Sequence, residues 1–189
     1  MKVRATALLA RKAMLVRQFG EERVARFFDE FADKEPFFKG RVLLQVSEIP
    51  ATVFLKLNEA MLATFYGGKA DTWWTFGKES AEWAFKEGPF RALFSTGDYV
   101  RFVEMTPAIW KSYFDEGYIE VSRDADQARI KILAVPIRHI YFEYSVLGFF
   151  ARGLELTGAT QVSGERLKGF SAGDGEVDYR YRWSSGPTR

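Results

Sequence analysis

The chain has 189 residues, a formal net charge of +2 and no cysteine. This length suits one domain with a substantial core, while scattered charges of both signs give no support for nucleic-acid binding. The absence of cysteine excludes disulfides, thiolate metal sites and cysteine nucleophiles. No apolar run reaches the roughly 18 residues of a membrane span, and the one near the N-terminus is too short for a secretory signal. We therefore expect a cytoplasmic protein with a single domain over residues 1–183 and no transmembrane segment.

Apolar residues at helical spacing predict helices through about the first 115 residues. The expected helices cover residues 2–18, 21–35, 47–66, 71–87, a short stretch at 90–94, and 98–114. Ser47 and Asp71 are the expected N-caps of two of them, and Pro107 is expected to kink or split the last. Gly77 lies among bulky residues and indicates a close approach of two helices.

Two β-hairpins separated by one helix are predicted for the rest of the chain. The first hairpin covers residues 119–134, the helix runs from 140 to 156, and Gly158 ends it. In the final strand, apolar residues from Val177 to Trp183 alternate with charged ones, which predicts one face on the core and one in water. The fold class is therefore α+β, with N-terminal helices packed on a small twisted antiparallel sheet. Residues 184–189 are expected to form a flexible tail.

His139 is the only histidine in the chain. One histidine does not complete a catalytic zinc site, which needs three protein ligands, and the sequence lacks a nucleophile elbow, a dinucleotide-binding glycine pattern and a P-loop. We therefore predict no catalytic residues, no metal site and no enzymatic activity. A single histidine suffices as the axial ligand of a haem. The competing interpretation is a partly buried histidine at a helix start, hydrogen-bonded to its neighbours.

Residues 140–183 carry the sequence motifs that resemble a known family. Gly148-Phe149-Phe150, Arg152-Gly153, Glu155 and Gly158 are followed by Gly173-Asp174 and by Tyr179, Tyr181 and Trp183. This order resembles the C-terminal signature of the 4-vinyl-reductase-like domain, whose fold is similar to those of the haem nitric-oxide-binding (H-NOX) domains and the TRAPP vesicle-tethering subunits. The whole chain looks most like an uncharacterised myxobacterial, hence bacterial, paralogous family of this superfamily. The resemblance implies helices and an antiparallel sheet around an apolar cavity.

The sequence also departs from these families at their metal and haem sites. Cysteines that vinyl-reductase-like domains often carry are replaced by Gly169 and Val177, which excludes a metal site built on them. H-NOX domains hold haem through a histidine on the helix before the central hairpin and clamp its propionates with a Tyr-x-Ser-x-Arg motif. The matching helix, 99–114, has no histidine, and the clamp motif is absent. We therefore expect no cofactor and keep haem as an alternative.

Aromatic residues are abundant, with 18 phenylalanines. Such rings either fill a core or line a cavity for an apolar ligand, and the sequence allows both. The resemblance favours a cavity walled by the most aromatic helices, with a predicted pocket of Trp73, Trp74, Phe102, Trp110, His139 and Tyr144. The main hypothesis is a non-enzymatic sensory domain that holds a small hydrophobic molecule and signals through a separate protein partner. The alternatives are a ligand-free homodimeric scaffold module, with a homodimer the default assembly in any case, and a haem or tetrapyrrole sensor that uses His139.

Overall fold

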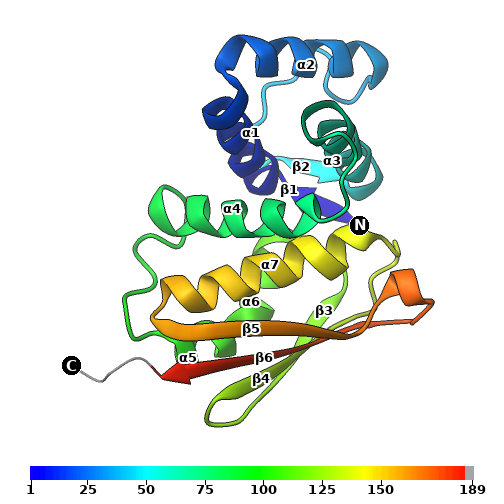
Figure 1. Cartoon of the computed structure of the whole chain (residues 1–189). Coiled ribbons are helices and arrows are strands. Elements are labelled where there is room, and N and C mark those ends of the chain that lie inside the picture. Colours follow the sequence, from blue (N-terminus) through cyan, green and yellow to red (C-terminus); the bar gives the residue numbers. More distant parts are fainter. Residues whose placement is uncertain (186–189) are drawn as a thin grey trace.

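The computed structural model describes residues 1–185 (Figure 1). The first part of the chain contains β1 (Lys2–Arg4), α1 (Thr6–Phe19), α2 (Glu21–Lys34), β2 (Glu48–Pro50), α3 (Ala51–Tyr66), α4 (Thr72–Lys86), α5 (Tyr99–Glu104) and α6 (Thr106–Tyr113). The second part contains β3 (Tyr118–Arg123), β4 (Gln127–Leu133), α7 (Ile140–Leu156), β5 (Ala159–Lys168), a short 3-10 helix (Phe170–Ala172) and β6 (Val177–Ser185). In Figure 1, α1, α2 and α3 lie on one side of α4, and α7 lies between α4 and the sheet.

The main sheet has the strand order β3-β4-β6-β5, and every neighbouring pair is antiparallel. This arrangement confirms the predicted α+β fold with two hairpins separated by a helix. The apolar residues of β6 face the core, and none is more than 4% exposed: Val177, Tyr179, Tyr181 and Trp183. On the opposite face Asp178 is also fully buried, because Arg129 of β4 covers it and donates from Nε to both carboxylate oxygens at 2.9 and 3.0 Å.

Strand β6 is longer than the sequence predicted. Ser184 pairs with Thr160 of β5, and the strand ends at Ser185. The expectation of a tail beginning at residue 184 is therefore wrong for these two positions, because the polar serines continue the ladder through backbone hydrogen bonds that do not depend on side-chain pattern. The rest of the expected tail, 186–189, lies outside the described residues.

The N-terminal residues form a strand where a helix was predicted. β1 pairs with β2 so that Val3 lies opposite Ile49, and both side chains are buried. Val3 also forms a β-bridge with Phe114, and the Lys2 backbone N–H donates to Asp115 Oδ1 at 2.6 Å. The prediction failed because the partner strand lies more than 40 residues away, where local periodicity carries no signal. β1 thus joins the first helices to the end of α6.

The helix boundaries and caps differ from the prediction at three places. α3 begins after Pro50, and the Ser47 hydroxyl accepts from Leu44 N at 3.0 Å within the preceding loop instead of capping a helix. Asp71 occupies the N-cap position of α4 but makes no side-chain capping hydrogen bond. Residues 90–93 form turns and Phe94 is irregular, so the short helix expected at 90–94 is absent. The split at Pro107 is confirmed, because α5 ends at Glu104 and α6 starts at Thr106 with the proline in its first turn.

Helix α7 is fixed by contacts on two sides. From the sheet, the Tyr179 hydroxyl donates to the carbonyls of Phe142 and Glu143, and the Tyr181 hydroxyl donates to that of Leu147 at 3.0 Å. On the other side α4 crosses α7 at two glycines. A Cβ placed on Gly77 would lie 1.9 Å from the Ser145 carbonyl oxygen, and one on Gly148 would lie 2.4 Å from that of Trp74. The close approach predicted at Gly77 is confirmed.

Candidate functional site

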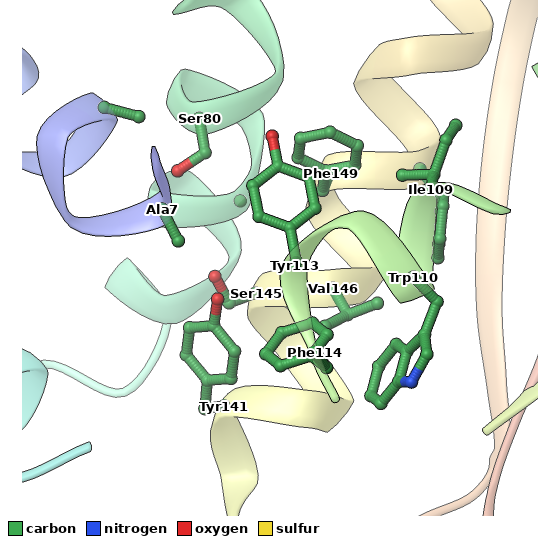
Figure 2. Close-up of a pocket in the computed structure, with 13 residues that line it drawn as sticks. Ala7, Ser80, Ile109, Trp110, Tyr113, Phe114, Tyr141, Ser145, Val146 and Phe149 are labelled. Atoms are coloured by element: carbon green, nitrogen blue, oxygen red, sulfur yellow. The ribbon is translucent and has the colours of Figure 1, made fainter. Parts of the chain in front are cut away.

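A cavity of about 40 Å³ lies between α1, α4, α6 and α7, next to the crossing of α4 and α7 (Figure 2). Its walls are mostly apolar side chains. The lining residues are Ala7 and Ala10 of α1, Gly77 and Ser80 of α4, Ile109, Trp110 and Tyr113 of α6, Phe114, and Tyr141, Ser145, Val146, Phe149 and Phe150 of α7. Four helices therefore contribute to one small apolar space.

Hydroxyl groups supply the polar part of the lining. Tyr141 and Ser145 lie one turn apart on α7, and Figure 2 shows their hydroxyls next to each other. Burial raises the pKa of Tyr141, while the charge of Arg11 and the hydrogen bond with Ser145 oppose this shift. Burial also raises the pKa of Tyr113. Both phenols therefore stay protonated at neutral pH and offer donors to the cavity.

Arg11 of α1 lies directly behind this lining and is 1% exposed. Its Nη2 donates to Ser145 Oγ at 3.5 Å, and its guanidinium carbon lies 4.0 Å from the centre of the Phe76 ring. Its Nε and Nη1 have no hydrogen-bond partner, and within residues 1–185 no carboxylate forms an ion pair with it. Burial lowers the pKa of Arg11 to about 10, so the side chain is charged at neutral pH.

Arg11 is not among the predicted pocket residues, although the sequence carries one signal for it. Leu8, Arg11 and Leu15 follow the i, i+3, i+7 spacing of one helix face, and both leucines are buried. A charged residue in the middle of an apolar stripe is unusual in a helix that packs on a core. That position marks a buried cation.

Of the six residues predicted to form a pocket, only Trp110 lines the cavity. Trp73 packs edge-on against His139, with ring centres 5.6 Å apart. Phe102 is fully buried beneath Gly153, and Tyr144 lies under the guanidinium of Arg166. Trp74 is partly buried where α4 crosses α7. The structure therefore places five of the six outside the cavity, and of these only Trp73 and His139 are described in contact with each other. Aromatic content shows which faces are buried but not where space remains between them.

His139 is the N-cap of α7 and does not line the cavity. Its Nδ1 accepts from the backbone N–H of Tyr141 at 3.0 Å, and its Nε2 lies 3.0 Å from Glu59 Oε1. With Nδ1 accepting, Nε2 carries the proton and donates to the carboxylate. One ring nitrogen thus caps α7 and the other contacts α3. This agrees with the interpretation of His139 as a partly buried histidine at a helix start, hydrogen-bonded to its neighbours.

Glu143 makes a structural network and no acid–base pair. It is fully buried, and it accepts hydrogen bonds from Arg166 Nη1 and from the hydroxyl and backbone N–H of Ser171. Arg152 of the same helix takes no part in this network, because it pairs with Glu82 and Glu155, each at 2.6 Å. The network ties α7 to the connection between β5 and β6.

Metal-binding and membrane-spanning features are both missing from the part of the chain that the structure describes. Among residues 1–185, no three His, Cys, Asp or Glu side chains are grouped as a metal site requires. No helix in that range has both the length and the hydropathy needed to cross a bilayer.

Comparison with known proteins identifies the fold. No family model and no curated protein matches the sequence. Solved structures do match. An H-NOX protein from S. oneidensis has a TM-score of 0.74 at 13% identity, with 98% of each chain covered. A variant of Tt H-NOX has a TM-score of 0.71 at 14% identity, covering 98% of this chain and 97% of that one. An oxygen-binding H-NOX domain related to soluble guanylate cyclases has a TM-score of 0.69 at 12% identity, covering 98% of this chain and 97% of that one. The chain therefore has an H-NOX-like fold.

Haem is the group that this fold suggests, since one matching structure was solved with oxygen bound and another is described by its haem redox potential. The cavity residues of this chain do not fit it. No His, Cys or Met lines the cavity, and the raised pKa values of Tyr113 and Tyr141 disfavour the phenolate that iron would take as a ligand. The space of about 40 Å³ is far smaller than the roughly 300–1,000 Å³ of ordinary small-molecule sites, so haem, like any other ligand of ordinary size, would have to enlarge it.

Proposed function

We propose that this chain is a non-enzymatic sensory domain that holds a small, largely apolar molecule in the cavity between α1, α4, α6 and α7. One observation carries the proposal: four helices from distant parts of the chain surround a space with apolar walls and a few converging hydroxyls, which is the usual composition of a ligand site. In this proposal the protein is cytoplasmic, signals through a separate protein partner, and shares ancestry with vinyl-reductase-like domains.

A ligand has to enlarge the cavity, because about 40 Å³ accommodates only about three or four water molecules at roughly 10–15 Å³ each. The α4–α7 wall resists expansion, since Gly77 and Gly148 place the two backbones in direct contact and the sheet tyrosines hold α7. α6 is the wall with more freedom. It has only eight residues, and it lies between the break that follows Glu104 and the turn at Gly117. Ligand entry would therefore displace α6 and the edge strand β3 that follows it.

Native mass spectrometry of gently purified protein tests this proposal. A variant whose cavity is filled by a larger side chain serves as the comparison. Ala10→Leu adds bulk inside the cavity, and Ala13→Leu makes the same change on the same helix away from the lining. We expect a mass excess of a few hundred daltons that persists in Ala13→Leu and disappears in Ala10→Leu. A clean mass at twice the chain weight in all three proteins would contradict the proposal and support the ligand-free homodimeric scaffold.

A haem sensor is the second candidate, and the haem and oxygen descriptions of the matching structures favour it. It would require His139 to leave both of its present hydrogen bonds. Haem reconstitution followed by absorption spectroscopy separates the two candidates. A Soret band that is lost in His139→Ala would establish the haem sensor, and a colourless reconstituted protein would exclude it.

A further inference from the structure

The geometry points to a carboxylate on the ligand: we infer that Arg11, Ser145 and Tyr141 form a buried subsite for the anionic head group of an otherwise apolar molecule. This inference rests on the proposed cavity and names the chemical class of its ligand. It begins from the charge of Arg11, which has no counterion within residues 1–185 although it is 1% exposed.

A buried cation without an ionic partner is costly, because the interior does not replace the water that the guanidinium has lost. Arg11 has only partial compensation. The Phe76 ring lies against its guanidinium, and the Glu79 carboxylate and the phenols of Tyr66 and Tyr141 influence its charge from a distance. Its contact with Ser145 is long, at 3.5 Å, and two of its nitrogens have no acceptor. The site is therefore incomplete in the absence of an anion.

The donors near Arg11 match a carboxylate in kind and in number. A carboxylate has two oxygens with about four acceptor positions. Ser145 and Tyr141 offer hydroxyl groups at the cavity wall, and Arg11, which contacts Ser145 from behind that wall, has two nitrogens without an acceptor. The phenol of Tyr141 remains protonated because burial raises its pKa, so it donates to an anion instead of repelling one. A single cation suits the single charge of a carboxylate better than the two charges of a phosphate monoester.

The remainder of the lining defines the other end of the ligand. Val146, Phe149 and Phe150 of α7 and Ile109 of α6 are apolar and lie on the cavity wall. The affinity of an alkyl chain for such a wall rises about fourfold for each buried CH₂ group. The ligand class is therefore an amphipathic carboxylic acid, with its head beside Arg11 and its chain between α6 and α7.

The test compares octanoate with 1-octanol, which have the same chain length and differ in charge, by isothermal titration calorimetry. The variants are Arg11→Met, which keeps the aliphatic stem, Arg11→Lys, which keeps the charge, and Lys12→Met, which removes an exposed charge from the next position of α1. We expect the wild type and Lys12→Met to bind octanoate at least about tenfold more tightly than 1-octanol. Arg11→Lys should retain a preference for octanoate. Arg11→Met should bind 1-octanol as the wild type does and lose the preference.

Different results would refute the carboxylate subsite and the cavity. Equal affinity of the wild type for octanoate and 1-octanol would overturn the carboxylate subsite and leave the cavity intact. Binding of neither compound would overturn the cavity, and with it the proposed function. Thermal unfolding without ligand supplies a second readout. Arg11→Met should raise the melting temperature by about 2–4 °C because an unpaired buried charge is removed, and a fall of that size would show that Arg11 has a structural role instead.

Discussion

The crossing of α4 and α7 provides the sharpest test of the structure, through the substitution Gly77→Ala. The new Cβ would lie 1.9 Å from the Ser145 carbonyl oxygen and 2.7 Å from the Phe149 nitrogen, whereas ordinary contact begins at 3.4 Å. The atoms that obstruct it belong to the backbone of α7 and cannot rotate away. The two helices must therefore separate by about 1.5 Å at this point, the difference between 3.4 and 1.9 Å.

The expected loss follows from two opposing effects. Overpacking of a well-filled interior costs about 1–3 kcal/mol, and backbone-to-backbone contact places this substitution at the upper end. Alanine regains about 1 kcal/mol over glycine in helix propensity. The net destabilisation is about 2 kcal/mol, which for a chain of this size lowers the melting temperature by about 4–8 °C.

Thermal unfolding followed by circular dichroism measures this difference. Thr75→Ala is the matched control, because Thr75 is exposed on the same helix and its replacement changes helix propensity without adding bulk at the crossing. We expect Thr75→Ala to remain within about 0.5 kcal/mol of the wild type. An unchanged or higher melting temperature for Gly77→Ala would refute the close crossing and with it the rigid wall of the cavity.

Three further predictions concern the core around α7. Gly153→Ala would place its Cβ 2.2 Å from Cζ of the buried Phe102 ring, and we expect a loss of about 1–2 kcal/mol in the free energy of unfolding, measured by urea denaturation. Arg166→Met would leave the fully buried carboxylate of Glu143 without its cation, and we expect a loss of about 3 kcal/mol in the same assay. Burial raises the pKa of Tyr179 well above 10. The neutral phenol therefore stabilises the folded protein fully below pH 10, and this stabilisation is lost as the pH rises through the folded-state pKa. We expect the protein to unfold in strong alkali together with a rise in tyrosinate absorbance.

Each of these predictions has a control or an opposing outcome. Adding Phe102→Leu to Gly153→Ala should recover part of the stability, and no recovery would mean that the ring is not the obstacle. Arg180→Met removes an arginine whose partner, Glu165, is 56% exposed, and it should cost less than about 0.5 kcal/mol. The full tyrosinate absorbance of all eight tyrosines at a pH where the protein is still folded would show that the buried phenols are accessible in the folded state.

Local patterns in the sequence predicted those elements whose burial follows a simple period. The alternation from Val177 to Trp183 identified the core face of β6, and the bulky residues around Gly77 identified a close helix contact. Both signals come from a few adjacent residues. The pairing of Val3 with Ile49 depends on two short segments far apart in the chain, and no local period reports it.

The candidate site was less predictable for a different physical reason. Hydrophobic pattern shows which side of a helix faces the core, but the position of a void depends on how several faces fit together. Phe102 was therefore expected in a pocket, although its ring fills the space left by Gly153. Arg11 was overlooked because the isolated charge on its apolar stripe becomes meaningful only when the surrounding helices are seen to leave it without a partner.

The β-bridge between Val3 and Phe114 provides a way to measure how often the cavity opens. Phe114 lines the cavity and is also held by β1, whose residue Lys2 donates to Asp115. Outward movement of α6 would therefore break backbone hydrogen bonds at the first strand. The amide protons of Lys2 and Asp115 are held in these contacts, so hydrogen–deuterium exchange at these two positions would report how often the cavity opens. A ligand that keeps α6 displaced would speed exchange at Lys2 and Asp115 and leave the amides of β6 protected.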